Sequence, residues 1–188
     1  WVSSVHNVYG NSWSGDWTLP VFTYVWRKPQ AVIAISEAVK DWLTLRRRIP
    51  EDKISVVYYG IEGDRFKKHV GDFRSAWGLD NRFVIGSIGR LEPRKGHNVL
   101  ISAMPSILSR VPNARLVIAG HDPWGYGQQL RSAIKDLHLP DYVELVGFQP
   151  NIPSFLNTID VFAFASHAEG FGQVLVEAMS AGKPVVAN

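Results

Sequence analysis

The chain has 188 residues, of which 46% are hydrophobic and 12% aromatic, so it can bury at least one full core. The net charge is +3 and the basic residues are scattered apart from residues 46–48, which argues against a nucleic-acid-binding stripe. Cysteine is absent, which excludes disulfides and thiol catalysis and is compatible with a reducing compartment. No apolar run reaches the length of a membrane span, and we expect a cytoplasmic protein.

The first third of the chain predicts short strands around one helix. Strands are expected at residues 2–5, 31–35 and 54–58, and a turn-rich loop at 10–15 precedes an aromatic, helix-like stretch to Lys28. Ser36 is a predicted N-cap for a helix that ends near Arg47, where basic side chains favour the C-terminus. The polar stretch 62–72 resembles a linker.

After this linker, strands and helices alternate strictly. Strands are expected at 83–88, 115–119, 142–146, 160–165 and 184–187, and helices at 96–110, 126–137, 152–156 and 172–181. This alternation predicts an α/β fold whose parallel sheet is covered by helices on both faces. Ligands of such sheets bind at the carboxyl ends of the strands. The four loops expected there, 89–95, 120–125, 147–150 and 166–171, all contain glycine, so their backbone can approach a ligand closely.

The first of these loops carries a cationic motif, GRLEPRKG at residues 89–96. Arg90 and Lys95 can converge on a diphosphate, Arg as a planar fork and Lys as a mobile point charge. Arg94 is expected to be solvated. The alternative interpretation of this segment is an ordinary charged loop.

A pair of acids marks the last loop, in the tract EGFGQVLVE at residues 169–177. Glu169 is expected just outside a helix and Glu177 within it, and the N–H groups at the helix start favour an anion between them. A nucleotide sugar has this polarity, with hydroxyls at both ends and a diphosphate between. The alternative is two surface acids, one of them favourably placed near a helix N-terminus.

These motifs, taken in order, resemble the retaining glycosyltransferases of family 4, enzymes of carbohydrate biosynthesis with the two-domain GT-B fold. The resemblance rests on GRLEPRKG (89–96), LVIAG (116–120), VELVGF (143–148) and the E-x7-E tract, and extends to AVIAISEAVKDWL (31–43) and VVYYGIEGDRF (56–66). It implies that residues 1–66 form the C-terminal part of an acceptor-side Rossmann-like domain. Residues 67–188 then form the donor-binding Rossmann-like domain, and both chain ends are expected to be cut.

The resemblance also implies roles by position: Arg90 and Lys95 hold the donor diphosphate, Glu177 the ribose, and Glu169 the transferred sugar. His6, at the end of a strand, matches a histidine near the donor sugar; the alternative is a histidine that is merely hydrogen-bonded. The implied catalytic residues are His6, Arg90, Lys95 and Glu169. The implied donor-binding residues are Gly89, Arg90, Lys95, Gly120, Phe148, Gln149, Glu169, Gly170, Phe171, Gly172 and Glu177.

The sequence is therefore interpreted as a hexosyltransferase that moves a sugar from a nucleoside-diphosphate sugar to an acceptor hydroxyl with retention of configuration. No metal or cofactor is expected, and the acceptor is a sugar, a lipid-linked sugar or a small molecule. Peripheral membrane contact is one interpretation of the aromatic and basic residues before position 29, and packing is the other; these residues are Trp13, Trp17, Trp26, Arg27 and Lys28.

Two other classes of function are alternatives. A nicotinamide-dependent oxidoreductase requires G-x-G-x-x-G after a strand, and neither residues 86–89 nor residues 120–127 fit that pattern. A nucleotide-sugar-binding fragment without turnover is the non-enzymatic alternative. Donor binding without sugar transfer would distinguish it from the enzyme.

Overall fold

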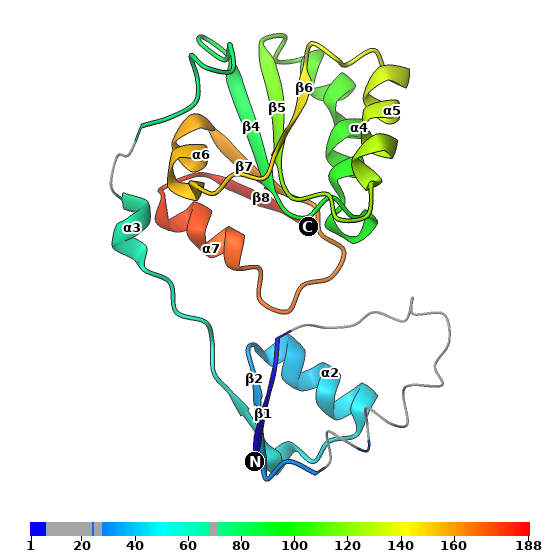
Figure 1. Ribbon diagram of the computed structural model, residues 1–188, viewed down its shortest axis with the longest axis vertical. Helices are drawn as coiled ribbons and strands as arrows, with labels where there is room; N and C mark the ends of the chain where they lie inside the picture. Colours follow the sequence, from blue (N-terminus) through cyan, green and yellow to red (C-terminus); the bar gives the residue numbers. More distant parts are fainter. Residues whose placement is uncertain (7–23, 25–27, 68–70) are drawn as a thin grey trace. The chain divides into compact units, whose positions relative to one another are not determined.

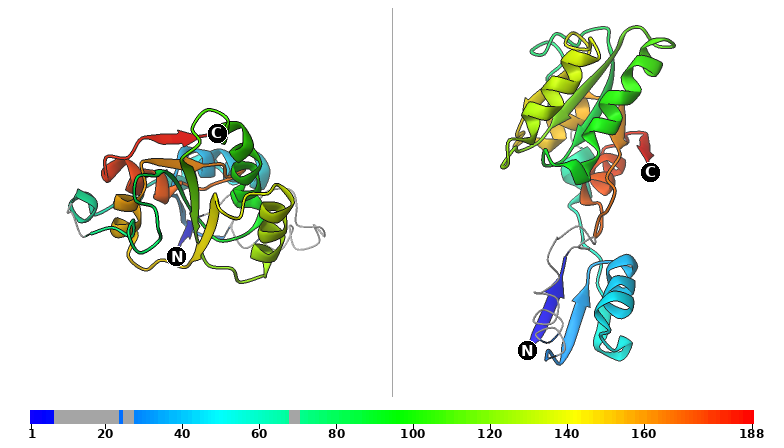
Figure 2. Two further views of the ribbon diagram at one scale, coloured as in Figure 1. Left: turned by 90° about the horizontal axis from the view of Figure 1, so that it is seen from above. Right: turned by 90° about the vertical axis from the view of Figure 1, so that its right-hand side faces the viewer.

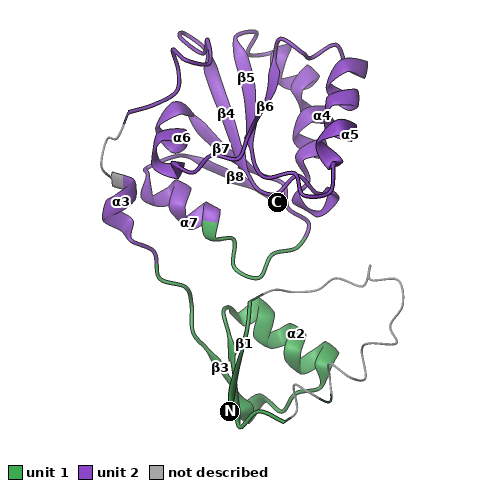
Figure 3. Ribbon diagram, in the orientation of Figure 1, with its two compact units in different colours: residues 1–60, 168–173 green, residues 61–167, 174–188 purple. Residues whose placement is uncertain are grey.

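The computed structural model describes residues 1–6, 24, 28–67 and 71–188, which divide into two units (Figure 3). The first unit consists of Trp1–Gly60 with Ala168–Gln173, and the second of Ile61–His167 with Val174–Asn188. Most of the turn-rich and aromatic stretch expected before Lys28, including all three of its tryptophans, lies outside the described residues.

In the residues that the structure describes, the first unit contains a small parallel sheet with a helix beside it (Figure 1). Strands β1 (Val2–Val5), β2 (Ala31–Ala34) and β3 (Ile54–Val56) pair in that order, and α2 (Glu37–Arg47) with the short turn η2 (Glu51–Lys53) connects β2 to β3. The Oγ of Ser36 accepts a hydrogen bond from the Val39 amide at 3.2 Å, which confirms the predicted N-cap. Val39 and Leu43 are fully buried among strand residues, so α2 is held by its apolar face.

Strand β3 is shorter than predicted. It ends at Val56, although the Val57 amide still donates to the Ala34 carbonyl at 2.9 Å. The neighbouring strand β2 ends at Ala34 because Ser36 already caps α2, so residues 58–60 have no strand beside them to continue the ladder.

The second unit contains a five-stranded parallel sheet in the order β6-β5-β4-β7-β8. Its strands are β4 (Phe83–Ile88), β5 (Ala114–Ala119), β6 (Val143–Gly147), β7 (Val161–Phe164) and β8 (Val185–Ala187). Its helices are α3 (Gly63–Lys67), α4 (His97–Leu108), α5 (Tyr126–Asp136), α6 (Ile152–Thr158) and α7 (Gln173–Ser180), with the turn η3 (Pro93–Lys95) before α4. Helices α4 and α5 cover one face and α6 and α7 the other (Figures 1 and 2), which confirms the predicted architecture.

Successive residues of the inner strands pack against opposite faces of this sheet. In β5, Leu116 and Ile118 contact the cluster formed with α4 and α5, whereas Val117 and Ala119 contact the cluster formed with α6 and α7. All four are almost completely buried. A strand with both faces covered needs apolar residues at every position, which explains the unbroken LVIA run.

The segment predicted as a linker contains a helix, α3, and that prediction is wrong for residues 63–67. Five residues are too few to form a stable helix by themselves, so tertiary packing must hold it. Phe66 is 6% exposed and packs in the cluster with Leu79 and Phe155, which lie far away in the sequence. Helix α6 also extends two residues beyond its predicted end, to Thr158.

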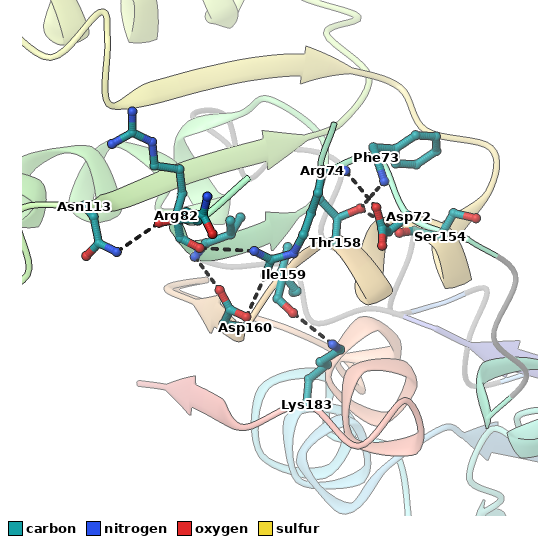
Figure 4. A network of polar contacts seen from close by, with 12 residues as sticks. Asp72, Phe73, Arg74, Arg82, Asn113, Ser154, Thr158, Ile159, Asp160 and Lys183 are labelled. Carbon is teal, nitrogen blue, oxygen red and sulfur yellow. Dashed lines mark hydrogen bonds and ion pairs between the residues drawn. The ribbon is translucent and has the colours of Figure 1, made fainter. Parts of the chain in front are cut away.

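A network of hydrogen bonds and ion pairs lies at the amino ends of β4 and β7 (Figure 4). Asp160, directly before β7, accepts hydrogen bonds from the Arg74 guanidinium at 2.6 Å and from the Val84 amide at 2.7 Å. Burial raises the pKa of Asp160, but these bonds outweigh it and hold the pKa below its usual value. Nearby, Lys183 Nζ donates to the Ile159 carbonyl at 2.9 Å. The network lies at the end of the sheet opposite the predicted ligand loops.

Candidate functional site

Backbone hydrogen bonds join the loops at the carboxyl ends of β4, β5 and β6. The Gly89 amide donates to the Ala119 carbonyl at 3.0 Å, and the Gly120 amide donates to the Gly147 carbonyl at 2.9 Å. Gly120 also lies so close to Gly89 that a Cβ at position 120 would overlap the Gly89 carbonyl oxygen. The predicted residues Gly89 and Gly120 are therefore in direct contact, and glycine is required at position 120 by this close approach.

Arg90 is exposed beyond β4, within a small charged group. Its guanidinium lies 3.4 Å from the Glu92 carboxylate and 5.4 Å from the centre of the Trp124 ring. Glu92 also pairs with Arg94 at 3.1 Å, and its side chain is only 12% exposed. The expectation that Arg94 is solvated is therefore wrong, because the Arg94 guanidinium is ion-paired with Glu92. An anion that binds Arg90 would compete with Glu92 for the guanidinium.

Lys95 belongs to the same loop and lies over Gly89. A Cβ placed on Gly89 would be 3.4 Å from the Lys95 Cδ. The next residue, Gly96, has a φ of 66°, and a Cβ there would be 2.7 Å from the carbonyl carbon of Ala165. The turn that carries Lys95 is thus pressed against the end of β7, which gives Arg90 and Lys95 a common rigid support.

The remaining predicted residues of the second unit lie on β6's loop and on α7. The Phe148 side chain is 68% exposed, and Gln149 donates from Nε2 to the Val146 carbonyl at 2.9 Å. Glu177 lies on α7 and is half-buried. An open pocket elsewhere in this unit, lined by residues 61–65 with Asn151 and Pro153, contains none of the predicted residues.

The other predicted residues, His6 and those at 169–172, lie in the first unit. The Ser36 hydroxyl donates to the Gly170 carbonyl. His6 Nδ1 is hydrogen-bonded to the Tyr59 hydroxyl, and the Tyr59 ring meets Phe171 edge-on at 5.7 Å. Helix α7 begins at Gln173, so Glu169 precedes it as expected. The structure thus brings His6 and Phe171 together through Tyr59, a residue of the VVYYGIEGDRF segment to which the sequence assigned no role.

His97 is a further residue that the sequence motifs did not identify. It is 1% exposed at the start of α4, and its Nε2 lies 3.3 Å from the carbonyl oxygens of both Gly89 and Arg90. Burial lowers the pKa of His97, although hydrogen bonds to the two carbonyls partly oppose this, and the neutral ring is favoured. The available signal in the sequence was its position directly after the Lys95-Gly96 pair.

The described residues contain neither a metal-binding cluster nor a membrane-spanning helix. Among residues 1–6, 24, 28–67 and 71–188, no group of three or more His, Asp or Glu side chains is placed to hold a metal ion. Within the same ranges, none of the helices has the length and hydropathy needed to cross a membrane.

Comparison with known proteins gives two family matches. Residues 71–188 match Glycosyl transferases group 1, and residues 1–65 match Glycosyltransferase Family 4. The uncharacterized glycosyltransferase MJ1607 of Methanocaldococcus jannaschii is 35% identical over 164 residues, which is 84% of this chain and 42% of that protein. A GDP-mannose-dependent alpha-(1-6)-phosphatidylinositol monomannoside mannosyltransferase of Mycobacterium tuberculosis is 35% identical over 141 residues, 69% of this chain and 36% of that protein.

The chain also resembles solved structures over nearly its whole length. Anabaena Alr3699/HepE in complex with UDP and glucose matches with a TM-score of 0.89 and 30% identity, over 99% of this chain and 52% of that one. WaaG, a glycosyltransferase involved in lipopolysaccharide biosynthesis, shares the fold with a TM-score of 0.82 at 17% identity, over 99% of this chain and 55% of that one. The chain thus spans about half of these structures and less than half of the two curated relatives.

Proposed function

Because the chain belongs to the glycosyl transferases group 1 and has the fold of GT-B glycosyltransferases, we propose that its second unit binds a nucleoside-diphosphate sugar. The observation that carries this proposal is that Arg90 and Lys95 lie on the same loop, which also contains Gly89, the residue in contact with Gly120. The HepE structure holds UDP and glucose, and the mycobacterial relative is GDP-mannose-dependent. Uridine and guanosine diphosphate sugars are therefore the first ligands to test.

The proposed reaction transfers a hexose with retention of anomeric configuration. The bond between the anomeric carbon and the diphosphate oxygen breaks, and the acceptor oxygen bonds to the same face of that carbon. The acceptor proton passes to a phosphate oxygen, so no protein nucleophile is needed. Negative charge grows on the leaving diphosphate, and Arg90 and Lys95 stabilise it electrostatically.

The remaining residues have proposed roles in holding the donor. Glu177 binds the ribose, while Glu169 and the backbone at 170–172 bind the transferred sugar. His6 lies near that sugar, and Phe148 with Gln149 flanks the nucleotide. These roles derive from the family resemblance.

A binding experiment tests the diphosphate site. Thermal shifts with UDP, GDP and ADP sugars identify the base, because a ligand of the folded state raises the melting temperature. Titration calorimetry then compares wild type with Arg90→Ala and Lys95→Ala, each expected to lose about 1.5–3 kcal/mol of binding free energy, and less at high salt. Arg131→Ala removes an exposed cation of α5 as the control. Wild-type affinity in both loop variants would rule out the diphosphate site.

Donor binding without turnover is a second candidate function for these 188 residues. Release of nucleoside diphosphate from the bound donor, in the presence of sugar acceptors, distinguishes the two functions. If transfer occurs, proton NMR of the product gives its anomeric configuration and tests retention.

A further inference from the structure

His97 connects the core of the second unit to the loop that carries Arg90. Its ring is buried at the first residue of α4, and Nε2 lies at equal distances of 3.3 Å from the carbonyl oxygens of Gly89 and Arg90. A single N–H shared between two carbonyls fits both distances. The ring also lies next to Gly89, since a Cβ on that glycine would be 3.6 Å from His97 Cε1.

These two contacts set the direction of two consecutive peptide groups. A trans peptide is planar, so its N–H points opposite to its carbonyl. With the Gly89 carbonyl turned toward His97, the Arg90 amide N–H points away from the buried ring. With the Arg90 carbonyl also turned inward, the Leu91 amide N–H points away from the ring and donates to the His121 carbonyl at 2.9 Å. Both partially negative carbonyl oxygens are thereby held on the His97 side of the loop.

We propose that His97 is a positioning residue for diphosphate binding: its Nε2–H holds the Gly89 and Arg90 carbonyls inward, so that the loop presents the Arg90 N–H group and guanidinium to the anion. This inference rests on the proposed function. An unrestrained loop can rotate either peptide and turn a carbonyl oxygen toward the phosphate, which repels the anion.

The protonation state of the ring agrees with this role. Within the described part of the chain, the buried Nδ1 has no hydrogen-bond partner. A neutral ring with its proton on Nε2 leaves one acceptor nitrogen unpaired, whereas a cationic ring would bury a positive charge together with an unpaired N–H donor, at greater cost. Burial accordingly lowers the pKa of His97.

The test compares three variants of α4 by titration calorimetry with UDP, GDP, ADP and inorganic pyrophosphate. His97→Phe keeps an aromatic ring but removes the donor, and His97→Gln restores an N–H at a similar reach. Ile101→Val trims another fully buried side chain of the same helix without touching a polar contact. Melting temperatures are recorded for all variants, and titrations are run well below the lowest of them.

We expect His97→Phe to bind the preferred diphosphate about tenfold more weakly, the size of effect that a shared hydrogen bond supports. His97→Gln should recover most of this loss, and Ile101→Val should bind like wild type even where its melting temperature falls equally. Wild-type affinity in His97→Phe, or an equal loss in Ile101→Val, overturns the proposal. If none of the four ligands binds to wild type, the proposed function itself fails; if wild type binds and His97→Phe is unaffected, only the role of His97 fails.

A spectroscopic measurement on the wild-type protein does not depend on the stability of any variant. Long-range 15N–1H NMR of the histidine rings reports the tautomer, and His97→Gln identifies the His97 signals among the six histidines. We expect a neutral ring protonated on Nε2, whose Nε2 shift changes when pyrophosphate or the diphosphate is added. A proton on Nδ1, or an Nε2 shift that does not respond to the bound anion, contradicts the positioning role.

Discussion

Replacing Gly120 by alanine tests whether the contact between the loops after β4 and β5 shapes the candidate site. A Cβ at position 120 would lie 2.8 Å from the carbonyl carbon of Gly89. Non-bonded carbons settle at about 3.5–4.0 Å, so the loops would have to separate by about 1 Å. That movement stretches the bonds from Gly89 to Ala119 and from Gly120 to Gly147, now 3.0 and 2.9 Å long. Losing both would lower the free energy of unfolding by about 1–3 kcal/mol.

Urea denaturation measures this loss of stability, and calorimetry with UDP and GDP measures the accompanying loss of affinity. The matched control is Gly63→Ala in α3, where a Cβ would meet nothing within 4 Å. It should leave the affinity unchanged and alter the unfolding free energy by less than about 1 kcal/mol, in the stabilising direction. A Gly120→Ala protein with wild-type stability and wild-type diphosphate affinity would refute the argument from close approach.

Three further predictions concern single side chains. Glu177→Gln should weaken binding of UDP and UDP-glucose alike, whereas Glu169→Gln should weaken binding of UDP-glucose only. The same comparison is made with GDP and GDP-mannose. Equal effects of Glu169→Gln on the free diphosphate and on the nucleotide sugar would contradict the assignment. Asp160→Asn should cost about 1–2 kcal/mol of unfolding free energy at pH 7. Because the pKa of Asp160 is lowered by folding, this stabilisation is present above its unfolded pKa of about 4, and the difference from wild type should vanish in urea melts as the pH falls through the folded value. Trp124→Ala removes the ring beside Arg90 and should weaken diphosphate binding about two- to fivefold in calorimetry, with no change counting against a role for that contact.

The sheet of the second unit was predictable because its signal is local. Strands covered on both faces leave unbroken apolar runs such as LVIA, and glycines mark where they end. Helix α3 was not predictable, because its stability depends on Phe66 packing against Phe155, far along the chain. The early end of β3 likewise depends on where β2 stops.

The candidate site was predictable only in part, for a similar reason. Arg90, Lys95 and Gly120 follow strands, so the topology alone brings their loops to one edge of the sheet. Their roles in donor binding stay predictions. Tyr59 and His97 act through contacts with a histidine ring and with backbone carbonyls, and no residue pattern records such contacts. The pairing of Arg94 with Glu92 depends on a half-buried carboxylate that the motif alone does not reveal.

The strand order has a consequence for how the protein is made. Residue 85 of the central strand pairs with residue 116 on one side and with residue 161 on the other. During synthesis the N–H and C=O groups along one edge of β4 therefore stay unpaired until the chain has grown through β7. Pairing of strands so far apart in the sequence slows folding, and in the meantime the unpaired edge can pair with strands of other chains. We expect a chain stopped before residue 161 to aggregate, and nascent chains of this protein to depend on chaperones during that interval.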